Sequence, residues 1–562
     1  MTPNFSTLDF VVFGLYAFLI VGVGLWVSRD KKGHKKNAED YFLAGKSLPW
    51  WAIGASLIAA NISAEQFIGM SGSGFAIGLA IASYEWMAAI TLLIVGKFLL
   101  PIFIKQGIYT IPEFIERRFS TQLKTILALF WIALFVFVNL TSVLYLGAKA
   151  LDTIIGTGSG ELLVISIIGL SLFAAAYSLW GGLSAVAWTD VIQVVLLVIG
   201  GFITAIIALD HVLPEGGVFA GLTHIYNTVP EKFSMILSKG EIIKPGGGDA
   251  WWDLPGLSVL LGGLWVANVY YWGFNQYIIQ RTLAAKSLQE AQKGIVFAAF
   301  LKLLIPIIVV LPGIIAFVMN STDGVLNLSE MAPGFFSADG SIANDNAAPW
   351  LITTFVPAGL KGLVVAALAA AIVSSMASML NSTSTIFTMD IYKPYINPAV
   401  SQTGMVTVGR ITATVALLIA MFIAPQLRSL GQAFQFIQEY TGVVSPGILA
   451  IFLTGLFWKS TTNKAAIFGI LISIPIAMYF KVGPNNWVDS SLFVTLPFMN
   501  QMMWTFCLTL VVIVLSSYLE NKGSADPKKI ELSKNLFETQ AIFNIGAFAV
   551  LIICAFLYAF FW

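Results

Sequence analysis

The side chains most able to do chemistry lie inside strongly apolar sequence. The stretch "SLIAANISAEQFIGMSGSGF", residues 56–75, carries Asn61, Ser63, Glu65 and Gln66 between apolar flanks and ends in a run of glycine and serine. Irregular backbone in hydrocarbon survives only beside protein or a water-filled cavity. We therefore predict a helix interrupted near the middle of a membrane, whose freed carbonyl and N–H groups can bind a cation and a polar solute.

A second segment has a similar pattern. Residues 263–280, "GLWVANVYYWGFNQYIIQ", place Ala267 and Asn268 after an apolar half-span, and aromatic residues and Asn275 follow. Two interrupted helices at corresponding positions of two halves are a sequence indicator of a transporter's binding site. The alternative is that these polar residues only pack between helices.

Three charged residues also fall within apolar spans. They are Glu85, Lys302 and Asp190. A charge at the centre of a bilayer costs at least ~2.5–3.5 kcal/mol, so each should face the interior and have a partner. Asp190 lies near the start of its span, where a capping role and a role on a cation path are both open.

A polar stripe marks the span at 351–390. Its members are Ser374, Ser378, Asn381 with Ser382, and Thr385, and Ser375 lies beside them. This spacing puts them on one face of a helix. Hydroxyl and carbonyl oxygens suit a hard cation stripped of water, although packing between helices is the competing interpretation. A further span, at 429–457, carries Gln438.

The elements that must position these residues are membrane helices. The chain has 562 residues, of which 58% are hydrophobic and 10% charged, with a mean hydropathy of +0.85; soluble domains carry about 25% charged residues. Apolar runs of about 18 residues or more recur throughout. We predict an all-α polytopic membrane protein with about fourteen spans. Their expected limits are 9–28, 48–75, 79–104, 122–149, 161–180, 184–209, 254–279, 291–319, 351–390, 405–424, 429–457, 464–480, 497–518 and 541–562.

Loop charges predict the orientation. Alternate loops contain 21 of the 30 basic residues, Arg281 among them, and such loops face the cytoplasm. Both termini should then lie on the extracytoplasmic side of the plasma membrane, the inner membrane of a Gram-negative bacterium. Each interrupted segment opens a set of five spans, and because five is odd the second set is inverted.

The sequence argues against an enzyme and against a nucleic-acid-binding protein. The run "GMSGSG" lacks the spacing and context of a dinucleotide fingerprint, and no phosphate loop, nucleophile elbow or zinc spacing occurs. The basic residues are scattered in short loops. We expect no cofactor, and any function must sit within the bundle.

Several long stretches resemble the solute:sodium symporter family, including its sugar-transporting bacterial and animal members. They are "DYFLAGKSLPWWAIGASLIAANISAEQFIGMSGSG", "YSLWGGLSAVAWTDVIQ", "GGLWVANVYYWGFNQYIIQRTLAAKS", "AALAAAIVSSMASMLNSTSTIFTMDIY" and "GQAFQFIQEYTGVVSPG". The resemblance runs from the first span to the last. It implies a LeuT-type fold with an extra helix at 9–28, inverted five-helix repeats at 48–209 and 254–457, and accessory helices at 464–562.

The resemblance also implies roles for individual residues. Sugar hydroxyls would bind Gln66, Glu85, Asn268, Lys302 and Gln438. The gate would consist of Tyr271 stacked on the sugar ring, with Asn61 in its network and Met70 and Phe434 covering the other side. Sodium would bind the carbonyls of Ala59, Ile62 and Ala371 and the hydroxyls of Ser374 and Ser375, with Asp190 on the cation exit path. Ala88 departs from the family's galactose symporter, where the resemblance leads us to expect serine.

The function implied is symport of Na⁺, as the coupling ion, with a hexose such as galactose or glucose. A single chain in membrane lipid suffices for this activity, and an oligomer is compatible with it. Sugar hydroxyls both donate and accept hydrogen bonds, which fits amides, a carboxylate and an ammonium. The alternatives are a Na⁺ symporter of proline or an organic anion, a sugar-gated sensor or channel, and a structural membrane subunit.

Overall fold

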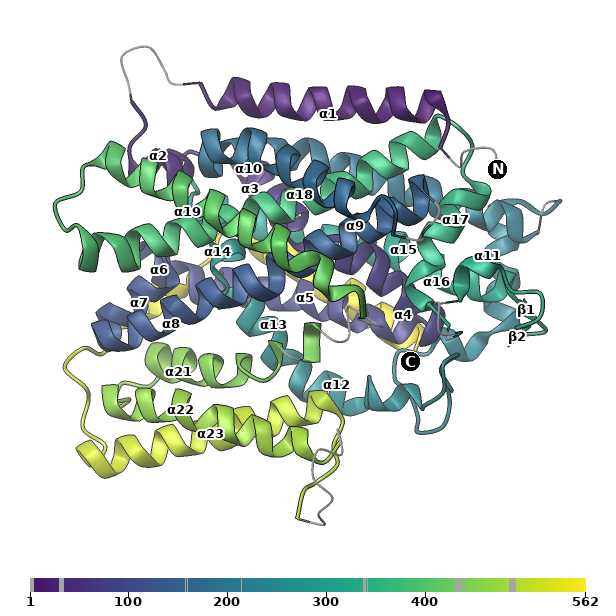
Figure 1. The fold of residues 1–562 in the computed structure, drawn as a ribbon. Coiled ribbons are helices and arrows are strands. Elements are labelled where there is room, and N and C mark those ends of the chain that lie inside the picture. The colour runs from purple at the N-terminus through teal and green to yellow at the C-terminus, as the bar shows by residue number, and fades with distance from the viewer. Residues whose placement is uncertain are drawn as a thin grey trace.

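The computed structural model describes residues 5–562 apart from 30–34, 157, 159, 214, 337–339, 341, 430–436, 440 and 485–491. The described chain is nearly all helical. Its one sheet within these ranges is a hairpin of two short antiparallel strands, β1 (Ser321–Thr322) and β2 (Val325–Leu326). The long helices run between two ends of the molecule, one of which carries this hairpin (Figure 1).

Ten helical stretches of the described chain are long and apolar enough to cross a membrane. They are α1 (Thr7–Val27), η3 (Leu79–Ala82) to α5 (Ser83–Ile94), η4 (Val95–Leu99) and α6 (Leu100–Gln106), α8 (Thr121–Ala133) to η5 (Leu134–Leu140) and α9 (Thr141–Ile155), α10 (Leu163–Val212), α15 (Leu288–Val309) to α16 (Leu311–Met319), α18 (Leu360–Ile386) to η10 (Phe387–Ile396), α19 (Gln402–Ile423) into η11 (Ala424–Ser429), α22 (Asn463–Val482), α23 (Phe498–Asn521) and α24 (Ala541–Phe560).

Shorter helices connect or complete these spans. They are α2 (Ala38–Leu43), η1 (Ala44–Lys46), α3 (Trp50–Asn61), η2 (Glu65–Met70), α4 (Ser71–Ala76), α7 (Ile111–Arg118), α11 (Gly217–Thr228), η6 (Pro230–Phe233), η7 (Ala250–Trp252), α12 (Leu257–Leu261), α13 (Gly263–Phe274), α14 (Gln276–Leu283), η8 (Pro333–Phe335), η9 (Asn344–Asn346), α17 (Ala347–Phe355), α21 (Ser445–Phe457) and η12 (Lys534–Phe537).

The ten long stretches agree with the fourteen predicted spans once the broken helices are counted. At about 1.5 Å per residue, the 50 residues of α10 would exceed twice the thickness of a bilayer core. The helix breaks at Gly182 (φ 61°, ψ −152°), so it holds the two spans predicted at 161–180 and 184–209. The remaining three spans are the α3–α4 segment, the pair α12–α13 bent by 75°, and the short apolar helix α21.

The first predicted interruption is confirmed. Helix α3 ends at Asn61, Ile62 is extended (φ −79°, ψ 109°), and helix resumes at η2. The polar residues of this segment satisfy the backbone groups that the break frees. The Gln66 side-chain oxygen accepts the Ser63 backbone N–H at 3.0 Å, and the Ser63 hydroxyl accepts the N–H of Glu65 at 3.1 Å.

The second interruption is not at Asn268, and that part of the prediction is wrong. Asn268 lies within α13, and the chain leaves helical geometry only at Asn275 (φ −83°, ψ 121°) before α14 begins. The Asn275 carbonyl accepts the backbone N–H of Ile279 at 3.0 Å and so starts α14, whereas the backbone continues as helix through Asn268.

The glycines after the first break allow close helix packing. A Cβ on Gly74 would lie 2.4 Å from the Val310 carbonyl oxygen, and one on Gly313 would lie 1.9 Å from that of Ser71. Helix α4 therefore packs directly on the backbone that enters α16. The close approach of these two helices, rather than phosphate binding, explains the glycines of the run "GMSGSG".

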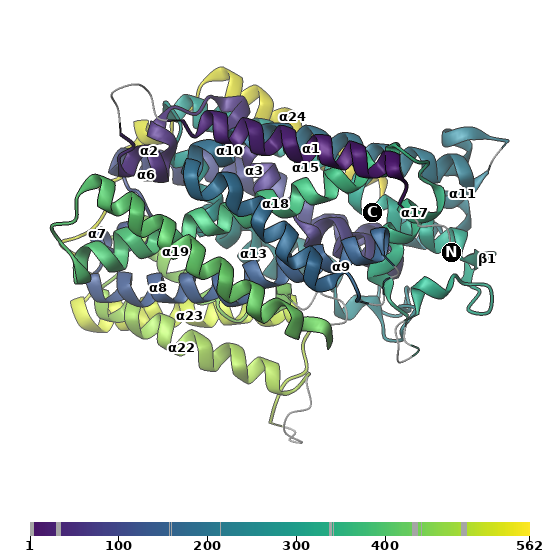
Figure 2. The same cartoon turned by 45° about the horizontal axis from the view of Figure 1, so that its top comes forward.

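Both chain termini lie at the end of the bundle that carries α11 and the hairpin (Figures 1 and 2). The Phe561 carbonyl accepts the Met235 N–H at 2.7 Å, which joins the C-terminus to the segment after α11. The turns holding α2, α6 and α7 lie at the opposite end. This agrees with an even number of crossings.

Candidate functional site

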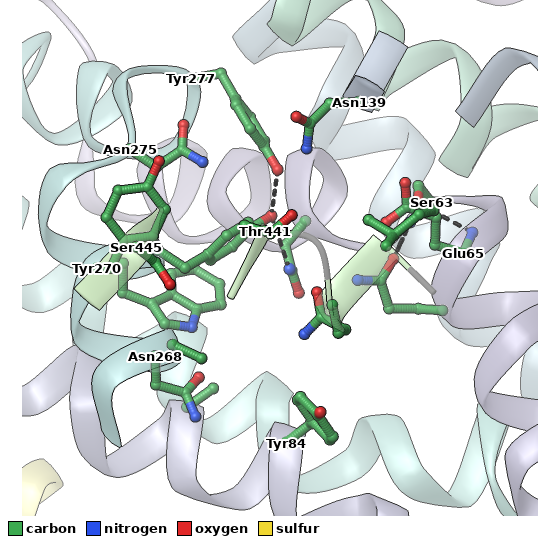
Figure 3. Close-up of a pocket in the computed structure, with 18 of the residues that line it drawn as sticks. Ser63, Glu65, Tyr84, Asn139, Asn268, Tyr270, Asn275, Tyr277, Thr441 and Ser445 are labelled. Carbon is green, nitrogen blue, oxygen red and sulfur yellow. Dashed lines mark hydrogen bonds between the residues drawn. The ribbon is translucent and has the colours of Figure 1, made fainter. Parts of the chain in front are cut away.

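A polar cavity lies where the two broken helices meet. The space between its lining atoms, with the part that is open to solvent included, is about 880 Å³. Its walls come from α3 and η2, α5, α13, α15 and residues 437–445 (Figure 3). The site therefore depends on both interruptions and on the helices crossing them.

A charge pair lies at the cavity wall. The Lys302 ammonium on α15 donates to the Glu85 carboxylate on α5 and to the Asn61 side-chain oxygen at the end of α3. The same ammonium lies 5.2 Å from the centroid of the Trp272 ring, within the range of a cation–π contact. Both charges are almost fully buried, and each neutralises the other, so the cavity presents strong donors and acceptors with little net charge.

Tyrosine hydroxyls link the two broken helices. The Asn61 amide donates to the Tyr271 hydroxyl at 3.0 Å, and the Tyr277 hydroxyl donates to the same oxygen at 2.7 Å. The Tyr271 ring also packs edge-on against Trp272 at 5.3 Å. Tyr271 thus joins the end of α3, α13 and α14 at the wall of the cavity.

Unpaired polar atoms converge on the cavity. Figure 3 shows these side chains arranged around its centre. Within the described chain, the buried lining atoms without a hydrogen-bond partner include Asn268 Nδ2, Asn139 Oδ1, Asn275 Oδ1, Glu65 Oε1, Thr441 Oγ1 and Ser445 Oγ. Buried polar atoms are nearly always satisfied. A ligand carrying several hydroxyl groups, each a donor and an acceptor, fits this set.

Most of the predicted solute and gate residues come together here. The cavity is lined by Asn61, Gln66, Glu85, Asn268, Tyr271, Lys302 and Gln438, and also by Ala88. The Gln66 amide oxygen is already engaged by Ser63. Met70 is fully buried in η2 and is not among the lining residues, and Phe434 lies outside the described residues.

Two of the predicted cation ligands, Ser375 and Ile62, approach each other beside the first break. The Ser375 hydroxyl on α18 donates to the Ala60 carbonyl at 3.0 Å and approaches that of Ile62 at 3.4 Å. Ala59, Ala371 and Ser374 are buried with it. Carbonyl and hydroxyl oxygens therefore gather where α18 crosses the end of α3, the ligand type that an alkali cation prefers.

Asp190 lies deeper in the bundle than its place in the sequence suggested. Its carboxylate accepts the hydroxyls of Ser374 at 2.6 Å and Ser56 at 2.5 Å, and lies 3.6 Å from the Arg281 guanidinium. Arg281 was counted with the loop residues, and this is wrong: it is fully buried and donates to Ser378 as well. Arg281 lies at the end of a helix beside polar residues, so its sequence position resembles that of a loop residue.

Later members of the stripe on α18 bond to α14. Ser382 donates to Gln280 at 2.7 Å, and Gln280 donates to Thr385 at 2.9 Å, whereas the buried Asn381 amide has no partner within the described chain. Packing between helices therefore accounts for Ser382 and Thr385.

The sequence reasoning missed several lining residues. They are Tyr84, Asn139, Trp272, Tyr277, Thr441 and Ser445. Asn139 was detectable as an amide in an apolar span, by the argument used for Asn61. The three aromatic residues carry no such signal, because aromatic side chains are common throughout these spans.

Comparison with known proteins places this site in a family. The model of the sodium:solute symporter family matches residues 41–473. The chain belongs to this family. It is 59% identical to the sodium/glucose cotransporter of Vibrio parahaemolyticus over 99% of this chain and 98% of that protein.

More distant members agree. The chain is 33% identical to sodium/glucose cotransporter 4 of Danio rerio over 84% of this chain and 71% of that protein. It is 32% identical to sodium/myo-inositol cotransporter 2 of Mus musculus, over 84% of this chain and 69% of that protein. A Na⁺-coupled sialic acid symporter in a substrate-bound outward-open state superposes with a TM-score of 0.75 at 25% identity. The superposition covers 92% of this chain and 98% of that protein.

These comparisons settle the class of the protein. It is a multi-pass membrane transporter of the LeuT fold, with Na⁺ as the coupling ion, and its relatives are symporters rather than enzymes. The interpretations as a sensor, a channel or a structural subunit have no support among them.

Proposed function

We propose that this symporter takes up a hexose, glucose or galactose, together with Na⁺. The observation that carries the proposal is the single cavity in which the Glu85–Lys302 pair faces unpaired amide and hydroxyl atoms. A neutral polyol can use such a mixed set of donors and acceptors completely. The matched relatives named for glucose and for myo-inositol carry neutral polyols.

An anionic solute is the rival. The sialic acid symporter shows that this fold accommodates a carboxylate-bearing solute. In the present cavity Lys302 is the one cation among the described lining residues, and it already pairs with Glu85. A carboxylate would compete with Glu85 for that ammonium, at a cost that a hydroxyl does not incur.

The proposed solute roles use the residues that line the cavity. Gln66, Glu85, Asn268, Lys302 and Gln438 bind hydroxyl groups, and Tyr271 covers the ring and closes the path toward α14. Aromatic faces suit the C–H face of a pyranose, and Trp272 and Tyr271 offer two beside the charge pair.

Sodium acts where α18 meets the first break. Ser375 now donates its proton to carbonyls of that break. Rotation of this hydroxyl turns its oxygen toward the same space, so that the carbonyls of Ala59, Ile62 and Ala371 and the hydroxyls of Ser374 and Ser375 surround Na⁺. The ion then ties the first broken helix to α18 and favours the state that accepts sugar, and by linkage the sugar favours Na⁺.

Release of Na⁺ and sugar requires the polar contacts around α14 to separate. Asp190, Arg281 and Gln280 hold α14 and α18 together, and Asp190 offers a carboxylate on the way out. We place this end of the bundle in the cytoplasm, with both termini outside and the two five-helix sets as inverted repeats. This orientation rests on the excess of basic loop residues at this end.

Reconstituted transport tests the proposal. Proteoliposomes should accumulate labelled glucose or galactose only with an inward Na⁺ gradient. With roughly 100 mV inside-negative and a tenfold gradient, one Na⁺ per sugar supplies about 3.7 kcal/mol, enough for a few-hundredfold accumulation. Equal uptake with K⁺ would overturn Na⁺ coupling, and uptake of proline or an organic anion without hexose would establish the rival substrate.

A further inference from the structure

A second cavity lies at the end of the bundle opposite the chain termini. It is bounded by α6, α7 and the segment that joins α23 to α24, and it encloses about 920 Å³ of space between atoms. Its lining residues are Ile102, Lys105, Gln106, Phe114, Arg117, Arg118, Lys528, Lys529, Ile530, Glu531 and Leu536. None of them lines the solute cavity.

The lining is strongly basic. Five of these residues are lysine or arginine, and one is acidic. Lys105 is exposed and forms no ion pair with a carboxylate of the described chain. Arg117 forms an ion pair with Glu113 at 2.5 Å, and the Lys529 ammonium lies 3.3 Å from the Glu531 carboxylate. The cavity thus has more positive charge than its own carboxylates neutralise.

Arg118 and Lys528 build the wall rather than serve as free cations. The Arg118 guanidinium, 1% exposed, donates to the carbonyls of Gly455 at 2.8 Å and Thr461 at 2.9 Å. The Lys528 ammonium donates to the Phe119 carbonyl at 2.8 Å. These contacts fix α7 against α21 and against the segment after α23, so the cavity has a defined shape.

The cavity also has an apolar side, which a site for a free inorganic anion does not need. Ile102, Phe114, Ile530 and Leu536 line it together with the cations. Next to it Phe98, whose side chain is 38% exposed on the outer surface of the bundle, packs against Phe537 at 5.7 Å. Exposed apolar surface therefore lies close to a cavity that is lined by cations and by hydrocarbon side chains.

We propose that this cavity binds the phosphate headgroup of an anionic phospholipid, with the first carbons of its acyl chains against Ile530, Leu536 and Phe98. Lys105 and Arg117 contact the phosphate, and the buried Arg118 holds the wall behind it. Basic pockets at this level of a membrane protein are suited to anionic headgroups. Bound lipid then ties the α23–α24 segment to α6 and α7.

The test uses the full-length protein, purified in detergent that contains no zwitterionic lipid. Its melting temperature is titrated with dioctanoyl phosphatidylglycerol, with dioctanoyl phosphatidylcholine and with inorganic phosphate. The variant Lys105→Ala/Arg117→Ala is compared with Lys393→Ala/Lys464→Ala, which removes two exposed cations elsewhere. We expect phosphatidylglycerol to stabilise the wild type and the control alike, and the first variant to bind it about thirtyfold more weakly, roughly fivefold per lost cation.

Three results overturn the proposal. Equal stabilisation by phosphatidylcholine would show that the headgroup charge is not recognised. Equal phosphatidylglycerol affinity in both double variants would show that the lipid binds elsewhere. Binding of inorganic phosphate alone, lost in Lys105→Ala/Arg117→Ala, would assign the cavity to a free anion. Because Lys105 and Arg117 are exposed, the variant should fold, and its unliganded melting temperature checks this directly.

Discussion

Lys302 is the residue on which the proposed solute site depends most directly. Lys302→Ala removes a proposed sugar ligand and leaves Glu85 buried without its partner, which costs about 3–5 kcal/mol. We expect sugar uptake to be abolished and the melting temperature to fall. The double variant Glu85→Gln/Lys302→Met should recover much of the stability but no transport. Full activity of Lys302→Ala, measured by labelled-sugar uptake, would exclude its role as a ligand.

Ser375 is the most direct test of the cation cluster. Ser375→Ala removes one oxygen ligand, and we expect the half-saturating Na⁺ concentration for uptake to rise about tenfold, equivalent to ~1.4 kcal/mol. The matched control is Ser384→Ala on the same helix, because the Ser384 hydroxyl bonds only to the Asn381 carbonyl of its own turn. An unchanged Na⁺ titration in Ser375→Ala would remove this residue from the site.

Ala88 allows a test of sugar preference. It lines the cavity three residues after Glu85 on α5, so Ala88→Ser adds a hydroxyl facing the solute. One further hydrogen bond of about 0.5–1.5 kcal/mol should lower the KM for one hexose by roughly twofold to tenfold. Competition of glucose and galactose for uptake measures the change. Equal KM values for both sugars in both proteins would show that this position does not select among them.

The residues that sequence reasoning found share one property. Asn61, Glu85 and Lys302 are polar groups that a membrane makes expensive, so their positions alone required a function and a partner. Trp272 and Tyr277 carry no such penalty and could not be distinguished from other aromatic residues. The burial of Arg281 was not predictable because its sequence position is at a helix end. Only the packing of α14 against Asp190 shows that it is buried.

Among the helices, α10 depends most visibly on one residue. Gly182 has a conformation that is essentially restricted to glycine, and a Cβ there would lie 2.3 Å from the Tyr41 carbonyl oxygen. Gly182→Ala should destabilise the protein by at least ~1–3 kcal/mol, seen as a lower melting temperature. Gly169→Ala in the same helix has open space around it and should be neutral or stabilising by ~0.5–1 kcal/mol. Equal melting temperatures for the two variants would contradict this account.

The two broken helices show what a pattern in the sequence can locate. At Asn61 the break and its caps are adjacent in sequence, and the prediction was correct. At Asn268 the same Ala-Asn pair lies in intact helix, because the break is seven residues later at Asn275. Polar residues mark the cavity in both cases, but the Ala-Asn pair does not fix where the backbone unwinds.

At the scale of the whole molecule, the span count was predictable because hydrocarbon thickness fixes helix length. The position of both termini at one end follows from an even count, and the structure agrees with it. The contacts between distant segments were not predictable. One of them, from the segment after α11 to α4, uses a lysine that hydropathy assigns to an ordinary loop.

That lysine is Lys232, which caps the C-terminal end of α4. Its ammonium donates to the carbonyls of Phe75 at 2.9 Å and Ala76 at 3.2 Å and lies 3.9 Å from the centroid of the Phe317 ring. Burial lowers the pKa of Lys232 to about 7, and the nearby Glu231 opposes this shift only partly. An unfolded lysine titrates near pH 10.4, so the two states differ in protonation between about pH 7 and pH 10.4.

The sign of the resulting pH dependence is fixed by linkage. In that window the unfolded chain binds the proton and the folded chain does not, so this group adds stability as the pH rises and loses it as the pH falls toward 7. The melting temperature of the wild type should therefore rise with pH from 7 to 10 relative to that of Lys232→Met, whose side chain cannot titrate. Lys239→Met, which changes an exposed lysine of the same segment, should follow the wild type. Parallel curves for the wild type and Lys232→Met would show that Lys232 keeps its proton in the folded state and that its burial does not govern stability.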